Sequence, residues 1–291
     1  MMNLSVATVV YQWAGMPLYT AMDHINAMGF NYVDILSYKR WQPCNEPIKN
    51  QLRLAAKMEK LDIKASSVIC LPDYQLGTDK KEEQEHDLAQ LKRAASFVKR
   101  MGGNQILICK AEGLRQFDKT PESVKKNAID RLNEFGEWCE ANDVRMTFEI
   151  EPPYIDMLNS AEEMHWLIQQ VKTTRAYCNV DIGHFVLLLQ SPKDIEVLKD
   201  DILHVHLSDN DGYSTEVDCL LGEGVVDFKA YLDKLFELGI EENCRKAKTD
   251  CVCAIEVAEG GNVIEHPDDM VLKSYNYMLK NYPYFRGADN Q

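Results

Sequence analysis

Two hydrophobic patterns alternate along the whole chain. Short runs of apolar and β-branched residues, typical of strands, are separated by longer stretches with apolar residues at helical spacing. The strand-like runs are Leu4–Val10, Tyr32–Leu36, Ile63–Ile69, Gln105–Cys109, Val144–Ile150, Cys178–Ile182, Ile202–Leu207 and Val252–Val257. The helix-like stretches are Leu18–Met28, Pro47–Leu61, Glu82–Met101, Pro121–Asn142, Ala161–Val171, Pro192–Leu198, Phe228–Leu238 and Pro267–Lys280. The pattern therefore predicts eight strands and eight helices in strict alternation.

Capping residues support several of these helix boundaries. Thr120-Pro121 and Ser191-Pro192 each combine an N-cap hydroxyl with a proline at the first helical position. Glycines stand just beyond predicted helix ends, where a left-handed C-cap favours them, at Gly29, Gly102 and Gly239.

Strand–helix alternation without hairpin signals indicates parallel strands. Eight such units in 291 residues close most naturally into a barrel. An open, doubly wound sheet is the alternative, but no Gly-x-Gly-x-x-Gly follows the first strand. We therefore expect an α/β protein, a (β/α)8 TIM barrel that spans residues 1–291 as one domain.

The net charge and the cysteine content indicate which cellular compartment and which classes of partner to expect. The net charge of −14 argues against a nucleic-acid partner, because phosphate binding requires clustered Lys and Arg. No apolar run approaches the roughly 18 residues of a membrane helix. The N-terminus also lacks the basic residues that precede the apolar stretch of a secretory signal. Nine cysteines, an odd number without zinc-finger spacing, favour a reducing compartment. We expect a cytoplasmic protein without membrane contacts.

Polar side chains end the last four predicted strands. They are Glu149 and Glu151 on the fifth, Asp181 and His184 on the sixth, His206 on the seventh and Glu256 on the eighth. In a barrel these strand ends converge at one face, where active sites lie. A single such carboxylate is as often solvated or paired with a lysine, but four together indicate a site. The oxygen donors Glu149, Asp181 and Glu256 and the imidazole of His206 form a mostly hard ligand set. Such a set suits Mn²⁺, Mg²⁺, Co²⁺ or Fe²⁺ better than structural zinc.

Four motifs give the chain a family resemblance. They are Asp181-Ile-Gly-His184, His204-Val-His206-Leu-Ser-Asp209-Asn, Ile-Glu256-Val and Gly222-Glu-Gly224-Val-Val-Asp227-Phe228. With the glutamate of the fifth strand, they resemble the xylose-isomerase-like TIM-barrel superfamily of sugar isomerases and epimerases. The resemblance implies that Glu149, Asp181, His206 and Glu256 bind one divalent cation, with Mn²⁺ expected. It also implies that Glu149 and Glu256 perform the acid–base steps.

Spacing alone does not separate Glu149 from Glu151, because residues two apart on a strand face the same side. The family's register of a valine five residues before the ligand favours Glu149, counted from Val144. Glu151 is then expected to bind substrate. The resemblance assigns His184 to a substrate hydroxyl, the alternative being a hydrogen bond to loop backbone.

Other residues are candidates for substrate contacts or support. Lys110 ends the fourth strand and would bind a substrate oxygen or pair with the surplus carboxylates. Trp13 follows the first strand and would form a sugar-stacking wall or pack in the core. Asp218 stands in a segment where many relatives carry Asp-x-His, here Glu216-Val-Asp218. His204 lies one layer below His206 and is expected to support it rather than bind the metal.

The function that follows is proton abstraction next to a sugar carbonyl through an enediolate, catalysed by a metal-dependent isomerase or epimerase. Ketose 3-epimerases usually carry an arginine six residues after the metal-binding histidine, whereas this chain has Gly212. That departure leaves room for a lyase, similar to a C-glycoside deglycosidase large subunit acting on a 3-keto sugar.

Two more distant alternatives are an AP-endonuclease-like barrel and a non-catalytic binding barrel. The strand ends Ile69-Cys70 and Cys109-Lys110 lack the histidines of the endonuclease. A non-catalytic barrel would bury four unused ligands at a cost in stability. The expected partners are a small sugar and either further copies of the chain or a small accessory subunit.

Overall fold

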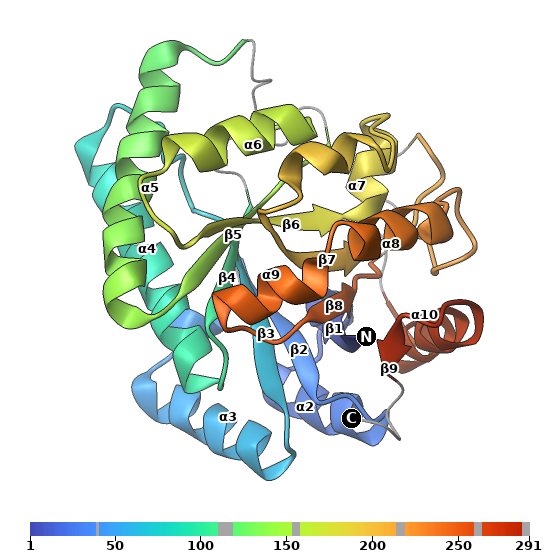
Figure 1. Cartoon of the computed structure of the whole chain (residues 1–291). Coiled ribbons are helices and arrows are strands. Elements are labelled where there is room, and N and C mark those ends of the chain that lie inside the picture. Colours follow the sequence, from blue (N-terminus) through green and yellow to red (C-terminus); the bar gives the residue numbers. More distant parts are fainter. Residues whose placement is uncertain (39–40, 110–118, 153–157, 214–218, 259–263, 287–291) are drawn as a thin grey trace.

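The computed structural model describes residues 1–38, 41–109, 119–152, 158–213, 219–258 and 264–286 (Figure 1). Eight parallel strands form a closed barrel, because β1 pairs with both β2 and β8. The strands are β1 (Met2–Ala7), β2 (Tyr32–Ser37), β3 (Lys64–Cys70), β4 (Gln105–Ile108), β5 (Arg145–Glu149), β6 (Ala176–Asp181), β7 (Ile202–Leu207) and β8 (Val252–Ile255). The (β/α)8 barrel expected from the sequence is confirmed.

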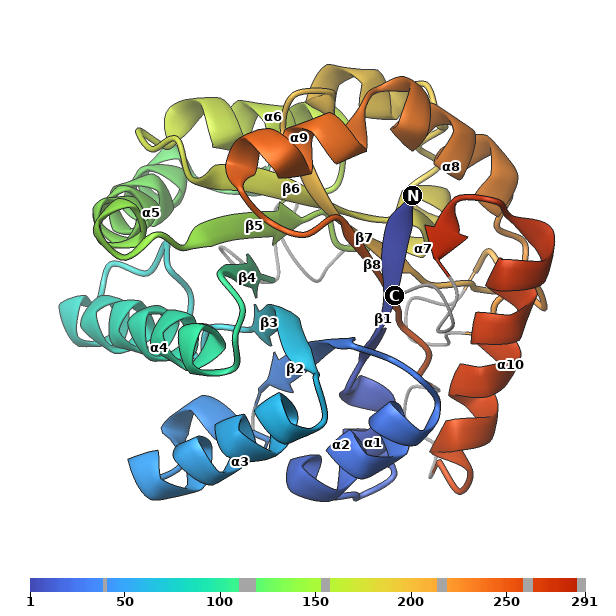
Figure 2. The same ribbon diagram turned by 60° about the horizontal axis from the view of Figure 1, so that its bottom comes forward.

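Helices surround these strands, as Figure 2 shows. The α-helices are α1 (Val9–Trp13), α2 (Leu18–Ala27), α3 (Ile48–Lys60), α4 (Lys81–Arg100), α5 (Glu122–Asn142), α6 (Ala161–Gln170), α7 (Ile182–Leu187), α8 (Phe228–Glu237), α9 (Ile240–Ala247) and α10 (Pro267–Asn281). The 3₁₀ turns η1 (Pro43–Asn45) and η3 (Asp194–Leu198) lie between helices of the described residues. A short ninth strand, β9 (Phe285–Arg286), pairs with the beginning of β1.

The first strand is shorter than its apolar pattern predicts. β1 ends at Ala7, and Val9 and Val10 belong to the helical turn α1. Both valines are buried. A short buried helix and a strand carry the same apolar run, so periodicity alone does not distinguish them.

Besides α1, the helices α7 (Ile182–Leu187) and α9 (Ile240–Ala247) are absent from the sequence prediction. α7 begins directly after β6, because the carboxylate of Asp181 accepts a hydrogen bond from the His184 amide at 2.9 Å and caps the helix. α9 follows α8 through Gly239, which has a φ of +81°. Its buried residues, Ile240, Cys244 and Ala247, show helical spacing. The segment predicted as a helix over Pro192–Leu198 forms only the 3₁₀ turn η3.

The turn before β4 requires both Gly102 and Gly103. Gly102 adopts a φ of +80°, a conformation that favours glycine. A side chain at Gly103 would place its Cβ 2.2 Å from the Ala65 carbonyl oxygen. The glycines thus let α4 return closely against β3 before β4 begins.

The apolar residues form two clusters. The larger packs the helices against the outside of the barrel and includes Phe97, Phe135 and Phe148. The smaller lines the inside of the rim and consists of Ala7, Val9, Leu36, Ile69, Leu107, Cys109 and Ala258. We call these seven residues the apolar wall. Most of them come from the carboxyl ends of β1–β4.

All nine cysteines are free thiols, and seven of them are buried, consistent with their apolar sequence context. In the part of the chain that the structure describes, no helix has the length and apolarity needed to span a bilayer.

Candidate metal centre

Four buried or half-buried donors meet above the second half of the barrel. Glu149 and Asp181 are the last residues of β5 and β6, His206 lies one residue before the end of β7, and Glu256 directly follows β8. Strand register places His206 beside Asp181 on one side and Ala254 on the other. We call Glu149, Asp181, His206 and Glu256 the four-residue cage.

The Nδ1 atom of His206 is the common point of this cage. It lies 2.6 Å from Glu256 Oε2, 3.3 Å from Glu149 Oε1 and 3.9 Å from Asp181 Oδ2. Neither His206 Nδ1 nor Asp181 Oδ2 has a hydrogen-bond partner, although both atoms are buried. Buried polar atoms normally have partners, so these two need one. A divalent cation among the donors would satisfy both, and the residues present therefore fit a metal ion.

Neighbouring side chains orient the carboxylates of the cage. Asp181 Oδ1 accepts hydrogen bonds from the Ser208 hydroxyl at 2.5 Å and from the His184 amide, so Oδ2 is directed toward the centre. Glu149 accepts hydrogen bonds from Asn179 Nδ2 at 2.6 Å and from the Cys109 thiol at 3.3 Å. Fixed outer contacts of this kind preorganise metal ligands.

Electrostatics in the cage favour a cation. Burial lowers the pKa of His206, but the carboxylates of Glu256 and Glu149 outweigh it and raise that pKa well above its ordinary value. Burial raises the pKa of Asp181. Both pKa values are thus raised, as expected for an excess of negative charge in a poorly solvated space. A bound divalent cation would offset that charge.

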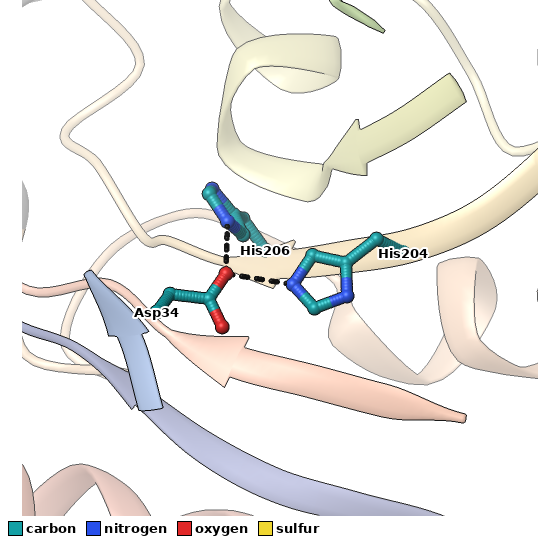
Figure 3. Close-up of side chains that lie close together, drawn as sticks. All are labelled: Asp34, His204 and His206. Carbon is teal, nitrogen blue, oxygen red and sulfur yellow. Dashed lines mark hydrogen bonds and ion pairs between the residues drawn. The ribbon is translucent and has the colours of Figure 1, made fainter. Parts of the chain in front are cut away.

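A further carboxylate, outside the cage, supports it from the opposite side of the barrel and was not predicted from the sequence. Asp34, on β2, lies 3.2 Å from His206 Nε2 and 2.7 Å from His204 Nε2 through its Oδ2 (Figure 3). His204 thus contacts Asp34, in the layer below the cage. The available signal was an aspartate in the apolar run Tyr32–Leu36, since a charged residue in a buried strand needs partners.

The two glutamates at the end of β5 separate clearly in space. Glu149 faces His206, whereas Glu151 lies 3.9 Å from the Nδ1 of His184. Nδ1 of His184 also lies 3.0 Å from the carbonyl oxygen of Ile150, which is the backbone contact foreseen as the alternative. Burial lowers the pKa of His184, but Asp181 and Glu151 outweigh it and raise the pKa to about 10.

Trp13 lies at the rim, 38% exposed, with its ring edge-on to Trp41 at 5.1 Å. Trp41 in turn packs against the apolar wall. Lys110 and Asp218 lie outside the described residues.

The loop after β7 owes its shape to Asp209. Its carboxylate accepts hydrogen bonds from the amides of Gly222, Gly224 and Val226 at 2.8–3.1 Å. A Cβ at Gly224 would lie 2.1 Å from Asp209 Oδ1, so only glycine fits there. The Gly-Glu-Gly motif is therefore a structural companion of β7 rather than a ligand.

A closed parallel barrel with a buried cluster of carboxylates and imidazole at its carboxyl rim defines a class of α/β barrels with a candidate metal centre. Comparison with protein families identifies one family within that class. The family model of the xylose isomerase-like TIM barrel matches residues 22–244. The chain belongs to this family, as its motifs predicted.

Individual relatives are distant. An uncharacterised protein of Methanocaldococcus jannaschii is 28% identical over 119 residues, and the match spans only 40% of each chain. Among solved structures, a D-tagatose 3-epimerase-like protein matches with a TM-score of 0.76 and 18% identity, covering 96% of this chain and 99% of that one.

Two further structures are similar in fold. The IolI protein with a bound zinc atom gives a TM-score of 0.78 at 16% identity, covering 97% of this chain and 100% of its own. The 3-keto-D-glucoside 4-epimerase of E. coli gives 0.72 at 17%, covering 94% and 99%. At these identities the likeness establishes the fold, and the activity has to be argued from the site.

Proposed function

We propose that this protein is a divalent-metal-dependent sugar isomerase or epimerase. The observation that carries the proposal is the Nδ1 of His206, which makes no hydrogen bond and faces the carboxylates of Glu149, Asp181 and Glu256 in a buried space. Three carboxylates and one imidazole suit Mn²⁺, the ion we expect, with Mg²⁺, Co²⁺ and Fe²⁺ as alternatives. The zinc bound by the similar IolI protein supports a divalent ion in this fold.

When bound, the cation would stabilise negative charge that develops on the carbonyl and hydroxyl oxygens of a sugar. Glu149 is the base that we assign to removal of the proton next to the carbonyl, leaving an enediolate. Glu256 would return a proton. Strands β5 and β8, which carry these glutamates, are separated in the barrel by β6 and β7. Return to the opposite face of the same carbon gives epimerisation, and return to the neighbouring carbon gives isomerisation.

The groups around the cage would hold the substrate. We assign His184 and Glu151 to sugar hydroxyls because this pair, 3.9 Å apart, lies beside the cage. Trp13 offers an exposed ring face at the rim for the C–H face of a sugar. Roles for Lys110 and Asp218 in substrate binding remain predictions.

One observation favours a second candidate, a lyase acting on an oxidised sugar. At position 212, where ketose 3-epimerases usually carry an arginine, this chain has a glycine with a φ of +81°. An arginine would be strained there, so this sugar contact is missing. A 3-keto substrate, such as the one named for the similar E. coli epimerase, would be deprotonated by the same base. As a C-glycoside deglycosidase, the protein would also require a small accessory subunit.

The test of function is deuterium exchange. The Mn²⁺-loaded protein is incubated in D₂O with a panel of ketoses and 3-keto-glycosides, and mass spectrometry and NMR locate the incorporated deuterium. Incorporation next to the carbonyl with a new epimer or isomer supports the proposal, whereas release of an aglycone identifies the lyase. If no substrate of the panel exchanged its proton, the proposed chemistry would be wrong.

The test of the metal site is elemental analysis of Asp181→Ala. We expect about one divalent ion per chain in the natural protein and little in the variant, because Asp181 Oδ2 has no partner other than the proposed ion. Fold is checked by circular dichroism in both. Full metal content in a folded Asp181→Ala protein would refute this ligand assignment.

A further inference from the structure

Asp34 is a carboxylate in an unusual place. It is the only charged residue of β2, it is fully buried, and it lies inside the barrel. A buried charge is stable only when several donors surround it. Four donors surround Asp34, so its carboxylate is ionised and accepts a hydrogen bond from each of them.

The donors come from three different strands. Oδ2 accepts from His204 Nε2 at 2.7 Å and from His206 Nε2 at 3.2 Å. Oδ1 accepts from the hydroxyl of Ser5 on β1 at 3.1 Å and from that of Ser66 on β3. These contacts fix the carboxylate in the centre of the barrel, with one oxygen directed at both histidines (Figure 3).

This arrangement determines which nitrogen of His206 carries hydrogen. An ionised carboxylate only accepts hydrogen bonds, so Nε2 of His206 must be protonated. In the neutral imidazole, Nδ1 then has a free lone pair, and Nδ1 is the atom that faces the cage without a hydrogen-bond partner. The same contact makes Nδ1 a stronger ligand, as carboxylate–histidine pairs do in metal sites.

A second cation among Asp34, His204 and His206 does not explain these contacts equally well. The three residues lie close enough to one another to bind an ion. However, the atoms that face each other already satisfy one another at hydrogen-bond distances. The buried atoms that make no hydrogen bond here, His206 Nδ1 and Asp181 Oδ2, lie on the cage side of the His206 ring instead.

We infer that Asp34 is a positioning residue of the metal centre, which holds His206 in the tautomer and orientation that present Nδ1 to the cation. His204 fixes Asp34, with its ring edge-on to that of His206 at 5.5 Å. The inference rests on the proposed metal site and not on which sugar is converted.

The first test needs no variant. The natural protein, labelled with ¹⁵N-histidine and loaded with Zn²⁺ as a diamagnetic probe, is studied by ¹H–¹⁵N NMR, with His206 assigned from a His206→Gln sample. We expect Nδ1 of His206 to be metal-bound and Nε2 to carry a slowly exchanging proton. Metal binding through Nε2, or a His206 without an Nε2 proton, would overturn the inference.

The second test measures Zn²⁺ affinity by competition with a chromophoric chelator. Asp34→Asn keeps the shape but removes the charge, and the dissociation constant should rise about 10–100-fold, as for other outer-shell carboxylates. Asp87→Asn is the matched control, because Asp87 is also a fully buried carboxylate but contacts the Tyr74 amide instead of a histidine. Its Zn²⁺ affinity should be unchanged.

The outcomes separate the two proposals. If the natural protein binds Zn²⁺ and folded Asp34→Asn binds it equally well, Asp34 is only structural and the inference is wrong. If Asp34→Asn weakens binding but no sugar is converted by the natural protein, the proposed function fails while the inference stands. A natural protein that binds neither Zn²⁺ nor any of Mn²⁺, Mg²⁺, Co²⁺ and Fe²⁺ would overturn both. If Asp34→Asn does not fold, the NMR experiment decides alone.

Discussion

At the ends of β5–β8 the inward-facing side chains are carboxylates and imidazoles, whereas at the ends of β1–β4 they are mostly aliphatic. The four-residue cage belongs to the first group, and the apolar wall, with Leu36, Ile69 and Leu107, belongs largely to the second. Cys109 joins the two, since it packs in the wall and donates to Glu149. The rim of the barrel thus has a charged half and an apolar half.

The difference assigns separate tasks to the two halves. In the function proposed above, the charged half would bind the cation and exchange protons. An apolar half beside it would limit the access of water, and electrostatic interactions are stronger where water is excluded. A ligand in this space would direct its oxygens to β5–β8 and its C–H face to β1–β4. The predictions below test whether the halves are as independent as this division implies.

The largest effect is expected from the charged half, at Glu149. Glu149→Gln removes a base and a ligand, and turnover should fall by about 10²–10⁴ from the loss of the base alone. Glu151→Gln is the matched control, because Glu151 contacts His184 and not His206. It should change the KM more than the metal content. Steady-state kinetics and elemental analysis of both variants test this, and the reverse pattern would show that Glu151 is the ligand.

In the apolar half, Leu107→Ala should affect stability and not metal binding. Leu107 is fully buried in the wall, and truncation of such a leucine costs about 2–5 kcal/mol. Urea unfolding measures this loss, and elemental analysis should still find the metal. Asp181→Ala provides the contrast, with metal lost and the fold kept. If folded Leu107→Ala also released its metal, the two halves would form one coupled unit.

The smallest effect concerns pH and a carboxylate outside the cage. Burial raises the pKa of Asp87 on α4 to about 6, despite a hydrogen bond from the Tyr74 amide. The folded protein therefore binds this proton more tightly than the unfolded chain, whose pKa is near 3.8. Stability from this group is present below about pH 4 and is lost as the pH rises to about 6, a change of up to about 3 kcal/mol.

Asp87→Asn should remove this contribution. The unfolding free energy of the natural protein, relative to that of the variant, should fall between pH 4 and pH 7 in urea titrations. Metal content should not change, since Asp87 lies outside the cage. Parallel pH profiles for the two proteins would mean that Asp87 ionises in the fold as easily as in the unfolded chain.

The two halves also differ in how much the sequence predicts. Along β5–β8, the polar strand ends Glu149, Asp181, His206 and Glu256 interrupt apolar runs, so the cage can be identified from the strand pattern and the family motifs. Along β1–β4, the apolar runs continue to the rim and indicate only strands. The one exception, Asp34, has its main partner, His204, 170 residues away. No local pattern predicts a pair so distant.

The starts and ends of helices were predicted less well than the positions of the strands. The capping of α7 by Asp181 uses the oxygen that does not face the cage, so one carboxylate serves both helix and site. In the sequence, Asp181-Ile-Gly-His184 looks like a turn after a strand, because glycine there normally weakens a helix. A glycine is needed at this position because there is no room for a side chain. A Cβ at Gly183 would lie 2.2 Å from the Ser208 hydroxyl that orients Asp181.

The closure of the barrel through β1 has a consequence for chain order. β1 lies between β8 and β2, and its first residues pair with β9, so Met2 is beside Phe285. A ring of strands has no first and no last member, and the neighbours of each strand are the same wherever the backbone is interrupted. The cage depends on that circular order, with β5–β8 contiguous in it. The chemistry at the rim therefore does not depend on which two strands of the ring lie next to the chain ends.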